Sequence, residues 1–255
     1  MPAYSAGQRQ GRVRRALKLM TTPKLRILVV NPNTDAAATE IIRAQAVTVA
    51  SADVEIVATT ASRGPAVIVT PADSAAQGPV TIEAIQAHAA SIDGAVIAAF
   101  SDPGLEVARK RFVFPVVGIG EASMKEGARI GRFVIVSANP SNESLYWAAA
   151  RRHGVADRLV NIRFFERGSL ACCGPDDRFA PADRPTLRTA VIEACAQAVS
   201  ADHADAIVVA GGPFAGVAVA IQTAVPIPVL DGVTAAVRRA DRLARTRRVD
   251  PTSYQ

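Results

Sequence analysis

Carboxylates and a thiol that lie near apolar runs are the side chains of this sequence best suited to acid–base chemistry. Asp102 and the neighbouring Ser101 follow one such run, and Glu121 follows the next. Asp231 ends the last apolar run, and Cys172 lies in a long stretch typical of a loop. A carboxylate in a cleft with little water can have a raised pKa and exchange protons near neutral pH. A thiol can serve as a nucleophile or as an acid, so these residues are candidate catalytic groups.

Each of these candidates also has an ordinary structural explanation. Asp102 stands before a proline, where aspartate is common in turns. Glu121 is expected in the first turn of a helix, where an acid is stabilised by the helix dipole, and Asp231 could cap a helix. Cys172 could belong to an ordinary loop, and Cys195 falls on a predicted helix, where a core position is the simplest explanation.

A second group of residues is suited to binding rather than to proton transfer. Asn31, Asn33 and Thr34 stand between an apolar run and a predicted helix, so that side chains and backbone N–H groups could hold a carboxylate or a carbonyl. The alternative is a plain turn in which Asn33 or Thr34 caps the helix. The residues expected to bind substrate are Asn31, Asn33, Thr34, Gly64, Pro65, Ala99, Phe100, Ser137, Gly211, Gly212, Pro213 and Asp231.

Two familiar kinds of site are poorly supported. Neither Ser101–Gly104 nor Gly211–Gly216 has the glycine and lysine spacing of a phosphate-binding loop. The sequence has no Gly-x-Ser-x-Gly elbow, and the three histidines, among them His153, are predicted on or beside helices. We therefore expect neither a nucleotide site nor a Ser-His triad. A metal site is not expected either, because the few Cys and His residues are scattered.

Strands and helices that alternate along the chain must position these residues. In the first half, apolar runs rich in β-branched residues predict strands, and the intervening stretches predict helices. Predicted strands are 25–31, 54–59, 93–100 and 115–120, and predicted helices are 35–50, 81–91, 105–111 and 121–127.

The second half repeats this order. Predicted strands are 132–137, 159–165, 205–211 and 228–231, and the longer predicted helices are 144–152, 186–200 and 233–248. Asp93 and Asp205 are 112 positions apart, and Gly104 and Gly216 have the same spacing. Pro115 and Pro228 are 113 positions apart, so the offset drifts only slightly, as expected for a duplicated unit.

This alternation predicts an α/β fold made of two doubly wound domains, each with a parallel sheet, that are related by pseudo-symmetry. Ligands of such sheets bind beyond the carboxyl ends of the strands, so the site is expected in the cleft between the domains. The predicted segments are a basic extension over 1–24, a first half over 25–122 and a second half over 123–232. The last helix, 233–248, could pack back on the first half.

Charge and composition limit the partners. The net charge is +6, and residues 1–24 hold six Lys and Arg without an acid, so the remainder sums to zero. A balanced body favours a small-molecule substrate and argues against nucleic acid. No apolar run is long enough for a membrane span, and three cysteines suit a cytoplasmic protein. The basic extension is expected to be a disordered tail or to precede a true start at Met20.

Five motifs, in the order in which a known family has them, carry a resemblance to that family. They are Ile-Leu-Val-Val-Asn-Pro-Asn-Thr at 27–34, Gly-Pro at 64–65, Ile-Ala-Ala-Phe-Ser-Asp-Pro-Gly-Leu at 97–105, Pro-Val-Val-Gly-Ile-Gly-Glu-Ala at 115–122, and Pro-Val-Leu-Asp-Gly-Val at 228–233. Together they resemble the hydantoin and allantoin racemase branch of the aspartate/glutamate racemase superfamily. The resemblance implies two flavodoxin-like domains with a cleft between them. It also implies a homo-oligomeric enzyme without a cofactor, in which two cysteines move a proton on and off an acidic carbon.

The sequence departs from that family pattern at both cysteine positions. The resemblance places them at Ala99 and Gly211, which are again 112 positions apart. Neither side chain can transfer a proton. Three explanations remain open. The first is an isomerase with acid–base groups elsewhere, at Ser101, Asp102, Glu121, Asp231 or Cys172. The second is a lyase, decarboxylase or hydrolase on a related substrate, and the third is a binding protein that has lost the chemistry.

Overall fold

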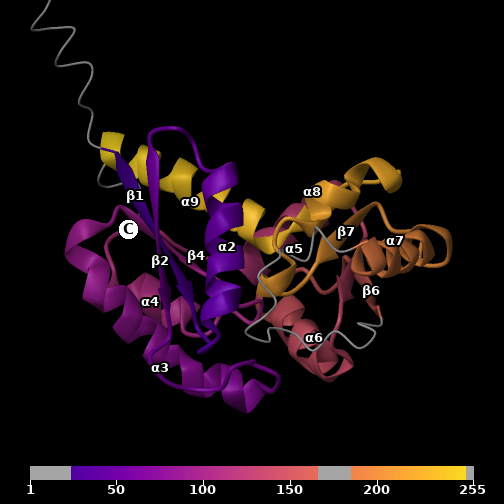
Figure 1. Cartoon of the computed structure of the whole chain (residues 1–255), viewed down its shortest axis with the longest axis horizontal. Coiled ribbons are helices and arrows are strands. Elements are labelled where there is room, and N and C mark those ends of the chain that lie inside the picture. Colours follow the sequence, from indigo (N-terminus) through magenta and orange to yellow (C-terminus); the bar gives the residue numbers. More distant parts are fainter. Residues whose placement is uncertain (1–23, 166–184, 251–255) are drawn as a thin grey trace, which may run out of the picture.

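The computed structural model describes residues 24–165 and 185–250. These residues form two α/β halves that lie side by side, each built on a four-stranded parallel sheet (Figure 1). The strand orders are β2-β1-β3-β4 and β6-β5-β7-β8, so the two halves share one topology. The predicted α/β class and the two-domain architecture are therefore confirmed.

The first half begins with the buried strand β1, whose side chains alternate between the two faces of the sheet. Ile27 and Val29 pack on the side of α2, whereas Leu28 and Val30 pack on the side of α3 and α4. The elements are β1 (Leu25–Asn31), α2 (Ala36–Val49), β2 (Val54–Thr60), α3 (Pro71–His88), η1 (Ala89–Ser91), β3 (Gly94–Ile97), α4 (Leu105–Arg111), β4 (Val116–Gly118) and α5 (Ile119–Ile130).

The second half repeats this layering around β5. Val134 and Val136 pack with α7 and α8, whereas Phe133 and Ile135 pack with α5 and α6. The elements are β5 (Phe133–Ser137), η2 (Pro140–Asn142), α6 (Glu143–Arg152), β6 (Leu159–Phe164), α7 (Pro185–Ser200), β7 (Ala206–Val209), η4 (Gly212–Phe214), α8 (Val217–Ile221), η5 (Gln222–Ala224), β8 (Val229–Asp231) and α9 (Gly232–Val249).

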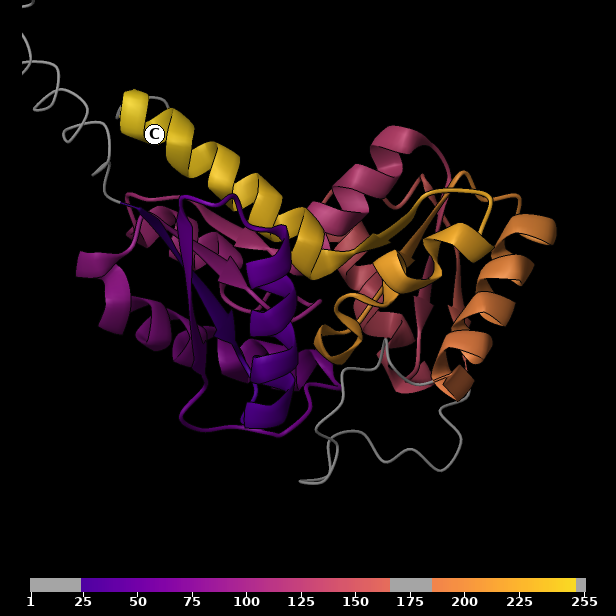
Figure 2. The same cartoon turned by 45° about the horizontal axis from the view of Figure 1, so that its top comes forward.

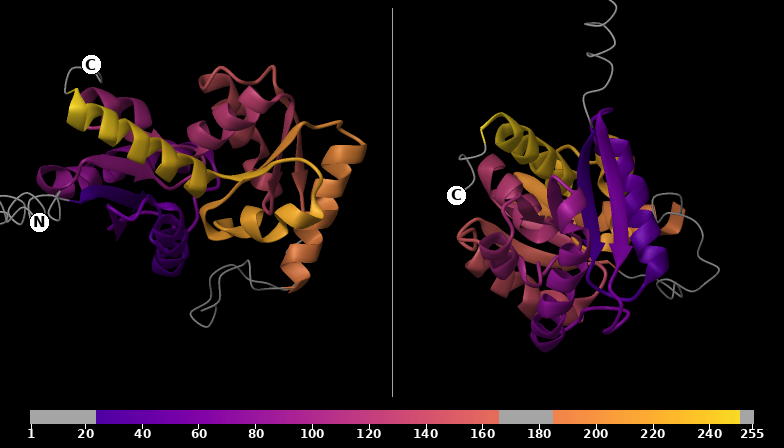
Figure 3. Two further views of the ribbon diagram at one scale, coloured as in Figure 1. Left: turned by 90° about the horizontal axis from the view of Figure 1, so that it is seen from above. Right: turned by 90° about the vertical axis from the view of Figure 1, so that its left-hand side faces the viewer.

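The helix that follows the last strand of each half crosses to the other half. α9 leaves the second half and covers the sheet of the first, as Figure 2 and both views of Figure 3 show. Its residues Ala236, Val237 and Ala240 pack in one cluster with Ile27 and Val96. In return, α5 follows the first sheet but packs Met124 among residues of the second. This exchange ties the two halves together and fixes the cleft between them.

Several predicted element boundaries need correction, and those at α3 and β3 bear on the site. α3 begins at Pro71, ten positions before the predicted start at Thr81. Its first turn is fixed by a capping box between Thr70 and Asp73, and Pro71 occupies the first helical position. The third strand is shorter than the predicted 93–100, because β3 leaves the ladder after Ile97. The residues that follow it turn into the cleft.

Candidate functional site

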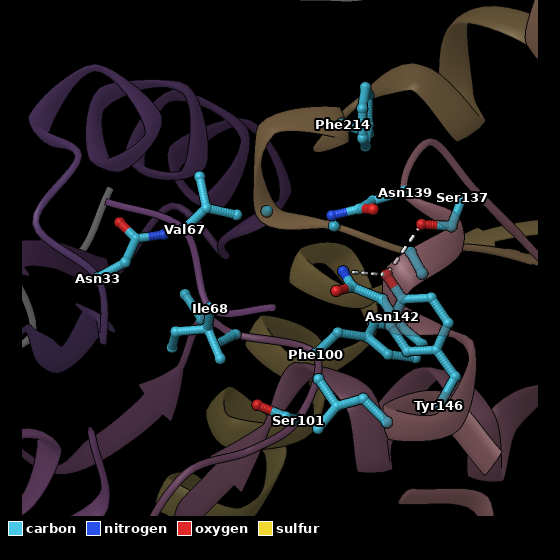
Figure 4. A pocket seen from close by; sticks show the side chains of 16 residues that line it. Asn33, Val67, Ile68, Phe100, Ser101, Ser137, Asn139, Asn142, Tyr146 and Phe214 are labelled. Carbon is cyan, nitrogen blue, oxygen red and sulfur yellow. Dashed lines mark hydrogen bonds between the residues drawn. The ribbon is translucent and has the colours of Figure 1, made fainter. Parts of the chain in front are cut away.

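A small pocket of about 80 Å³ lies between the two halves, where the carboxyl ends of β1, β3, β5 and β7 converge (Figure 4). The strand order reverses between β1 and β3 in one sheet and between β5 and β7 in the other. Ligands bind at such switch points, and here two of them meet. The lining residues are Asn33, Val67, Ile68, Ala98, Ala99, Phe100, Ser101, Ser137, Asn139, Asn142, Leu145, Tyr146, Ala210, Gly211, Gly212 and Phe214.

The pseudo-symmetry of the halves extends to single hydrogen bonds at the pocket. The N–H of Ala98 donates to the carbonyl of Val30 at 2.8 Å, and the N–H of Ala210 donates to the carbonyl of Val136 at 2.9 Å. Ala99 and Gly211 come directly after these bonds, and both line the pocket. They therefore occupy corresponding positions in the two halves.

Asn33 presents hydrogen-bond donors to the pocket. Its Oδ1 accepts from the Nδ2 of Asn31 at 2.7 Å and from the N–H of Asp35 at 3.0 Å. With the oxygen held on this side, the Nδ2 group of Asn33 is turned towards the pocket (Figure 4). One side-chain donor and one backbone donor thus decide which end of the amide a ligand meets.

Asn139 repeats the arrangement in the second half. Its Oδ1 accepts from the N–H of Ser141 at 3.1 Å, two residues ahead, as the Oδ1 of Asn33 accepts from Asp35. Its Nδ2 group also faces the pocket (Figure 4). The pocket therefore receives one neutral amide donor group from each half, a pair suited to two carbonyl oxygens.

A hydroxyl network forms part of the wall that the second half contributes. The Tyr146 hydroxyl lies 2.9 Å from the Ser137 hydroxyl and accepts from the Nδ2 of Asn142 at 3.2 Å. The Phe100 ring meets the Tyr146 ring edge-on at 5.1 Å between centroids. Because Phe100 follows β3 and Tyr146 lies on α6, this ring contact joins the two halves beside the site.

The backbone at Gly211 is built around glycine. Its φ of 118° lies in a region that L side chains rarely adopt, and a Cβ there would lie 2.9 Å from the Phe214 ring. At Gly212, a Cβ would lie 2.8 Å from the side chain of Ile42 in the other half. A side chain at Gly211 would therefore crowd the η4 turn, and a side chain at Gly212 would crowd the contact between the two halves.

Comparisons with known proteins bear on what such a cleft does. The family model "Asp/Glu/Hydantoin racemase" matches residues 27–240. The chain belongs to this family. The hydantoin racemase of Pseudomonas sp. (strain NS671) is 33% identical over 221 residues, which span 86% of each chain.

Solved structures agree with this assignment. Allantoin racemase from Klebsiella pneumoniae superposes with a TM-score of 0.78 at 33% identity, over 88% of this chain and 89% of that one. Allantoin racemase from Pseudomonas fluorescens gives 0.77 at 28% identity, over 87% and 92%. The racemase-family resemblance drawn from the sequence is thus confirmed, and the chain is a racemase-like enzyme.

Seven of the predicted site residues line the pocket of this racemase-family chain: Asn33, Ala99, Phe100, Ser101, Ser137, Gly211 and Gly212. Among the candidate catalytic residues within the described part of the chain, Ser101 lines it, whereas Asp102, Glu121 and Asp231 do not. Its hydroxyl accepts from that of Ser74 at 2.9 Å. Whether these residues act on a substrate remains a prediction.

Four predicted binding residues do not line the pocket but belong to the turns beside it: Asn31, Thr34, Gly64 and Pro65. Asn31 is buried and orients Asn33. The N–H of Thr34 donates to the carbonyl of Pro65 at 3.1 Å, which fastens the loop after β2 to the turn after β1. That loop brings Val67 and Ile68 into the pocket wall.

Asp102 is fully buried and is committed to three hydrogen bonds. Its carboxylate accepts from the N–H of Gly120 at 3.0 Å and of Glu121 at 2.7 Å, and it lies 3.1 Å from Nε2 of His153. Burial raises the pKa of Asp102, whereas His153 and the two N–H groups oppose that rise. Sequence patterns did not indicate this partner, because His153 lies 51 positions later, directly after the end of α6. The geometry is that of an anchor between β3, α5 and α6.

Glu121 lies in an ion-pair cluster rather than at the pocket wall. Its buried carboxylate contacts Arg109, and it pairs with Lys125 at 2.6 Å. Burial raises the pKa of Glu121, but the two ion pairs outweigh burial and lower the pKa to about 2. A carboxylate with such a pKa is a poor general base at neutral pH.

The ion pairs of Glu121 predict that the stability of the fold decreases in acid. An acid with a lowered pKa in the folded state stabilises the fold above its ordinary pKa of 4.5 and loses this contribution as the pH falls through about 2. We expect Glu121→Gln to lower the free energy of unfolding by about 2–3 kcal/mol at neutral pH and to flatten its dependence on pH in the acid range. Urea unfolding of both proteins as a function of pH measures this, and equal acid slopes would contradict it.

Asp231 caps α9. One carboxylate oxygen accepts from the N–H of Thr234 at 2.8 Å, and the other accepts from its hydroxyl at 2.6 Å. Burial raises the pKa of Asp231 in spite of these bonds. Asp231 does not line the pocket described above, and its predicted contact with substrate remains untested.

The remaining candidates fall partly outside the described residues. Cys172 lies there entirely, and for Pro213 the structure describes only its place in the η4 turn. Cys195 is a buried thiol whose pKa burial raises to about 12. Within 24–165 and 185–250, no cluster of metal-ligating side chains occurs, and no helix has the length and apolar character to span a bilayer.

Several lining residues were not predicted: Val67, Ile68, Asn142, Leu145 and Tyr146. A signal existed for some of them. The spacing of four between Asn142 and Tyr146 allows the two side chains to meet across one helical turn. Val67 and Ile68 lie in a loop without periodicity, so the sequence carried no signal for them.

Proposed function

We propose that this enzyme exchanges a proton at the acidic carbon beside a carbonyl of a small cyclic amide of the hydantoin type, without a cofactor and without thiols at positions 99 and 211. The observation that carries the proposal is the pair of amide donors, Asn33 and Asn139, at corresponding places in the two halves. A hydantoin has two carbonyl oxygens on opposite sides of one ring nitrogen. The hydantoin racemase relatives support this choice of substrate class.

The donors also suit the chemistry. Removal of a proton beside a carbonyl places negative charge on the carbonyl oxygen, and oriented N–H groups stabilise that charge. The pocket is small, which favours a compact ring with few substituents. Inversion needs an acid–base group on each face of the carbon. For that role we retain Ser101, which lines the pocket, and Cys172 as candidates.

Proton nuclear magnetic resonance in deuterated water tests the proposal. The purified protein is incubated with hydantoins, allantoin, amino acids and substituted malonates, and entry of deuterium at the acidic carbon is followed. We expect exchange with a hydantoin and retention of its skeleton. New product signals would instead favour the lyase or hydrolase alternative, and ligand-induced thermal stabilisation without any reaction would favour a binding protein.

Variants then assign the acid–base groups. Ser101→Ala and Cys172→Ser are compared with Cys195→Ser, which changes a buried thiol away from the pocket. Loss of exchange in one of the first two, with the control active, identifies a residue of the exchange step. If both retain full exchange, neither candidate takes part.

A further inference from the structure

Asn142 carries an unpaired acceptor at the pocket. Its Oδ1 is buried and has no hydrogen-bond partner among the described residues, while its Nδ2 donates to the Tyr146 hydroxyl at 3.2 Å. A buried acceptor without a partner is costly and calls for an explanation. Asn142 lines the pocket (Figure 4), so a bound ligand can supply the missing donor.

The local backbone explains why this amide is available. Asn142 occupies the N-cap position of α6, where asparagine normally bonds to the first turn of the helix. Here the residue has helical φ and ψ angles, and its side chain makes no capping bond. The amide instead reaches one turn ahead to Tyr146, whose hydroxyl is in turn paired with Ser137. This pairing holds the nitrogen on Tyr146 and leaves the oxygen unpaired.

The other polar groups of the pocket define the ligand that fits this acceptor. Asn33 and Asn139 offer N–H donors, which suit carbonyl oxygens. A carboxylate would satisfy the donors but has no hydrogen for Asn142. A cyclic amide with a free N–H satisfies all three side chains.

We propose that Asn142 Oδ1 accepts a hydrogen bond from a substrate N–H and so makes the pocket select cyclic amides whose ring nitrogen is unsubstituted. This rests on the proposed function and deepens it. A methyl group on that nitrogen removes the donor and places a carbon against the buried oxygen. Sites that hydrogen-bond a substrate group discriminate strongly against analogues that lack it, because their own buried polar atom is then left unpaired.

The test uses the hydantoin derived from alanine and its two mono-N-methyl derivatives. Deuterium exchange at the ring carbon gives kcat/KM for each with the unmodified protein. We expect methylation of one of the two nitrogens to lower kcat/KM by about 100-fold or more. Equal rates for all three compounds would overturn the inference and leave the proposed function intact.

Asn142→Ala provides the second arm, with Ser144→Ala as the control in the same turn, because Ser144 is exposed and does not line the pocket. We expect Asn142→Ala to reduce the discrimination to a few-fold and Ser144→Ala to preserve it. Retention of full discrimination in Asn142→Ala would also overturn the inference.

If no hydantoin exchanges, calorimetric binding of the same three compounds tests the role of Asn142 separately from the proposed function. Binding that discriminates then supports the role of Asn142 although the proposed reaction has failed, and binding that does not discriminate overturns it.

Discussion

Asn33→Asp is expected to lower kcat/KM for hydantoin exchange by about 10²–10³-fold while the fold stays intact. The aspartate keeps an oxygen that can accept from Asn31 and Asp35, as Oδ1 of Asn33 does now. It loses the N–H donors that face the pocket, and it adds negative charge where the reaction itself develops negative charge. The change thus removes transition-state stabilisation but leaves the turn after β1 in place.

Kinetics of deuterium exchange and thermal unfolding measure the two effects separately. Gln86→Glu makes the same change from amide to carboxylate at an exposed position of α3, where the side-chain oxygen accepts from Arg111. It should leave kcat/KM unchanged. Asn139→Asp should match Asn33→Asp, because its Oδ1 bond to Ser141 is likewise preserved. If Asn33→Asp exchanges protons as fast as the Gln86 control, Asn33 is not a donor to the substrate.

Asp102→Ala is expected to lower the free energy of unfolding by about 3–5 kcal/mol. The substitution leaves the N–H groups of Gly120 and Glu121 and the His153 ring without their buried acceptor. It also places alanine at a φ of 49°, which aspartate tolerates better. The segment after β3, the start of α5 and the end of α6 lose their shared contact.

Urea unfolding of Asp102→Ala and Asp102→Asn provides the measurement. The asparagine keeps one acceptor oxygen, so we expect its loss of stability to be smaller than that of the alanine. A different result would support the prediction that Asp102 is catalytic. If both variants unfold at the same urea concentration as the unmodified protein and both have lost proton exchange, the carboxylate acts in the reaction and not as an anchor.

The sequence was sufficient to locate the strands along the chain, although not the ends of all of them. The apolar run at Leu25–Asn31 predicts β1 with the bounds that the structure has, because a strand buried on both faces has few alternatives. The start of α3 was predicted ten residues too late, because a Gly-Pro pair such as Gly78-Pro79 usually indicates the end of a helix. In the structure the helix passes through that pair, with Gly78 packed close to Gly104.

The sequence by itself determined the α/β class, the duplication and the equivalence of Ala99 with Gly211, because all three follow from periodicity and a constant offset. Only the tertiary structure decided what each polar side chain faces. Asp102 meets a histidine from the other half, Glu121 is held by Arg109 and Lys125, and Asn142 is left with an unpaired oxygen in the cleft. Such pairings depend on which elements pack together and on the direction in which each side chain leaves its backbone. Spacing along the chain places a residue at a strand end, but the partners that fix its charge and its free hydrogen-bonding atoms come from distant segments.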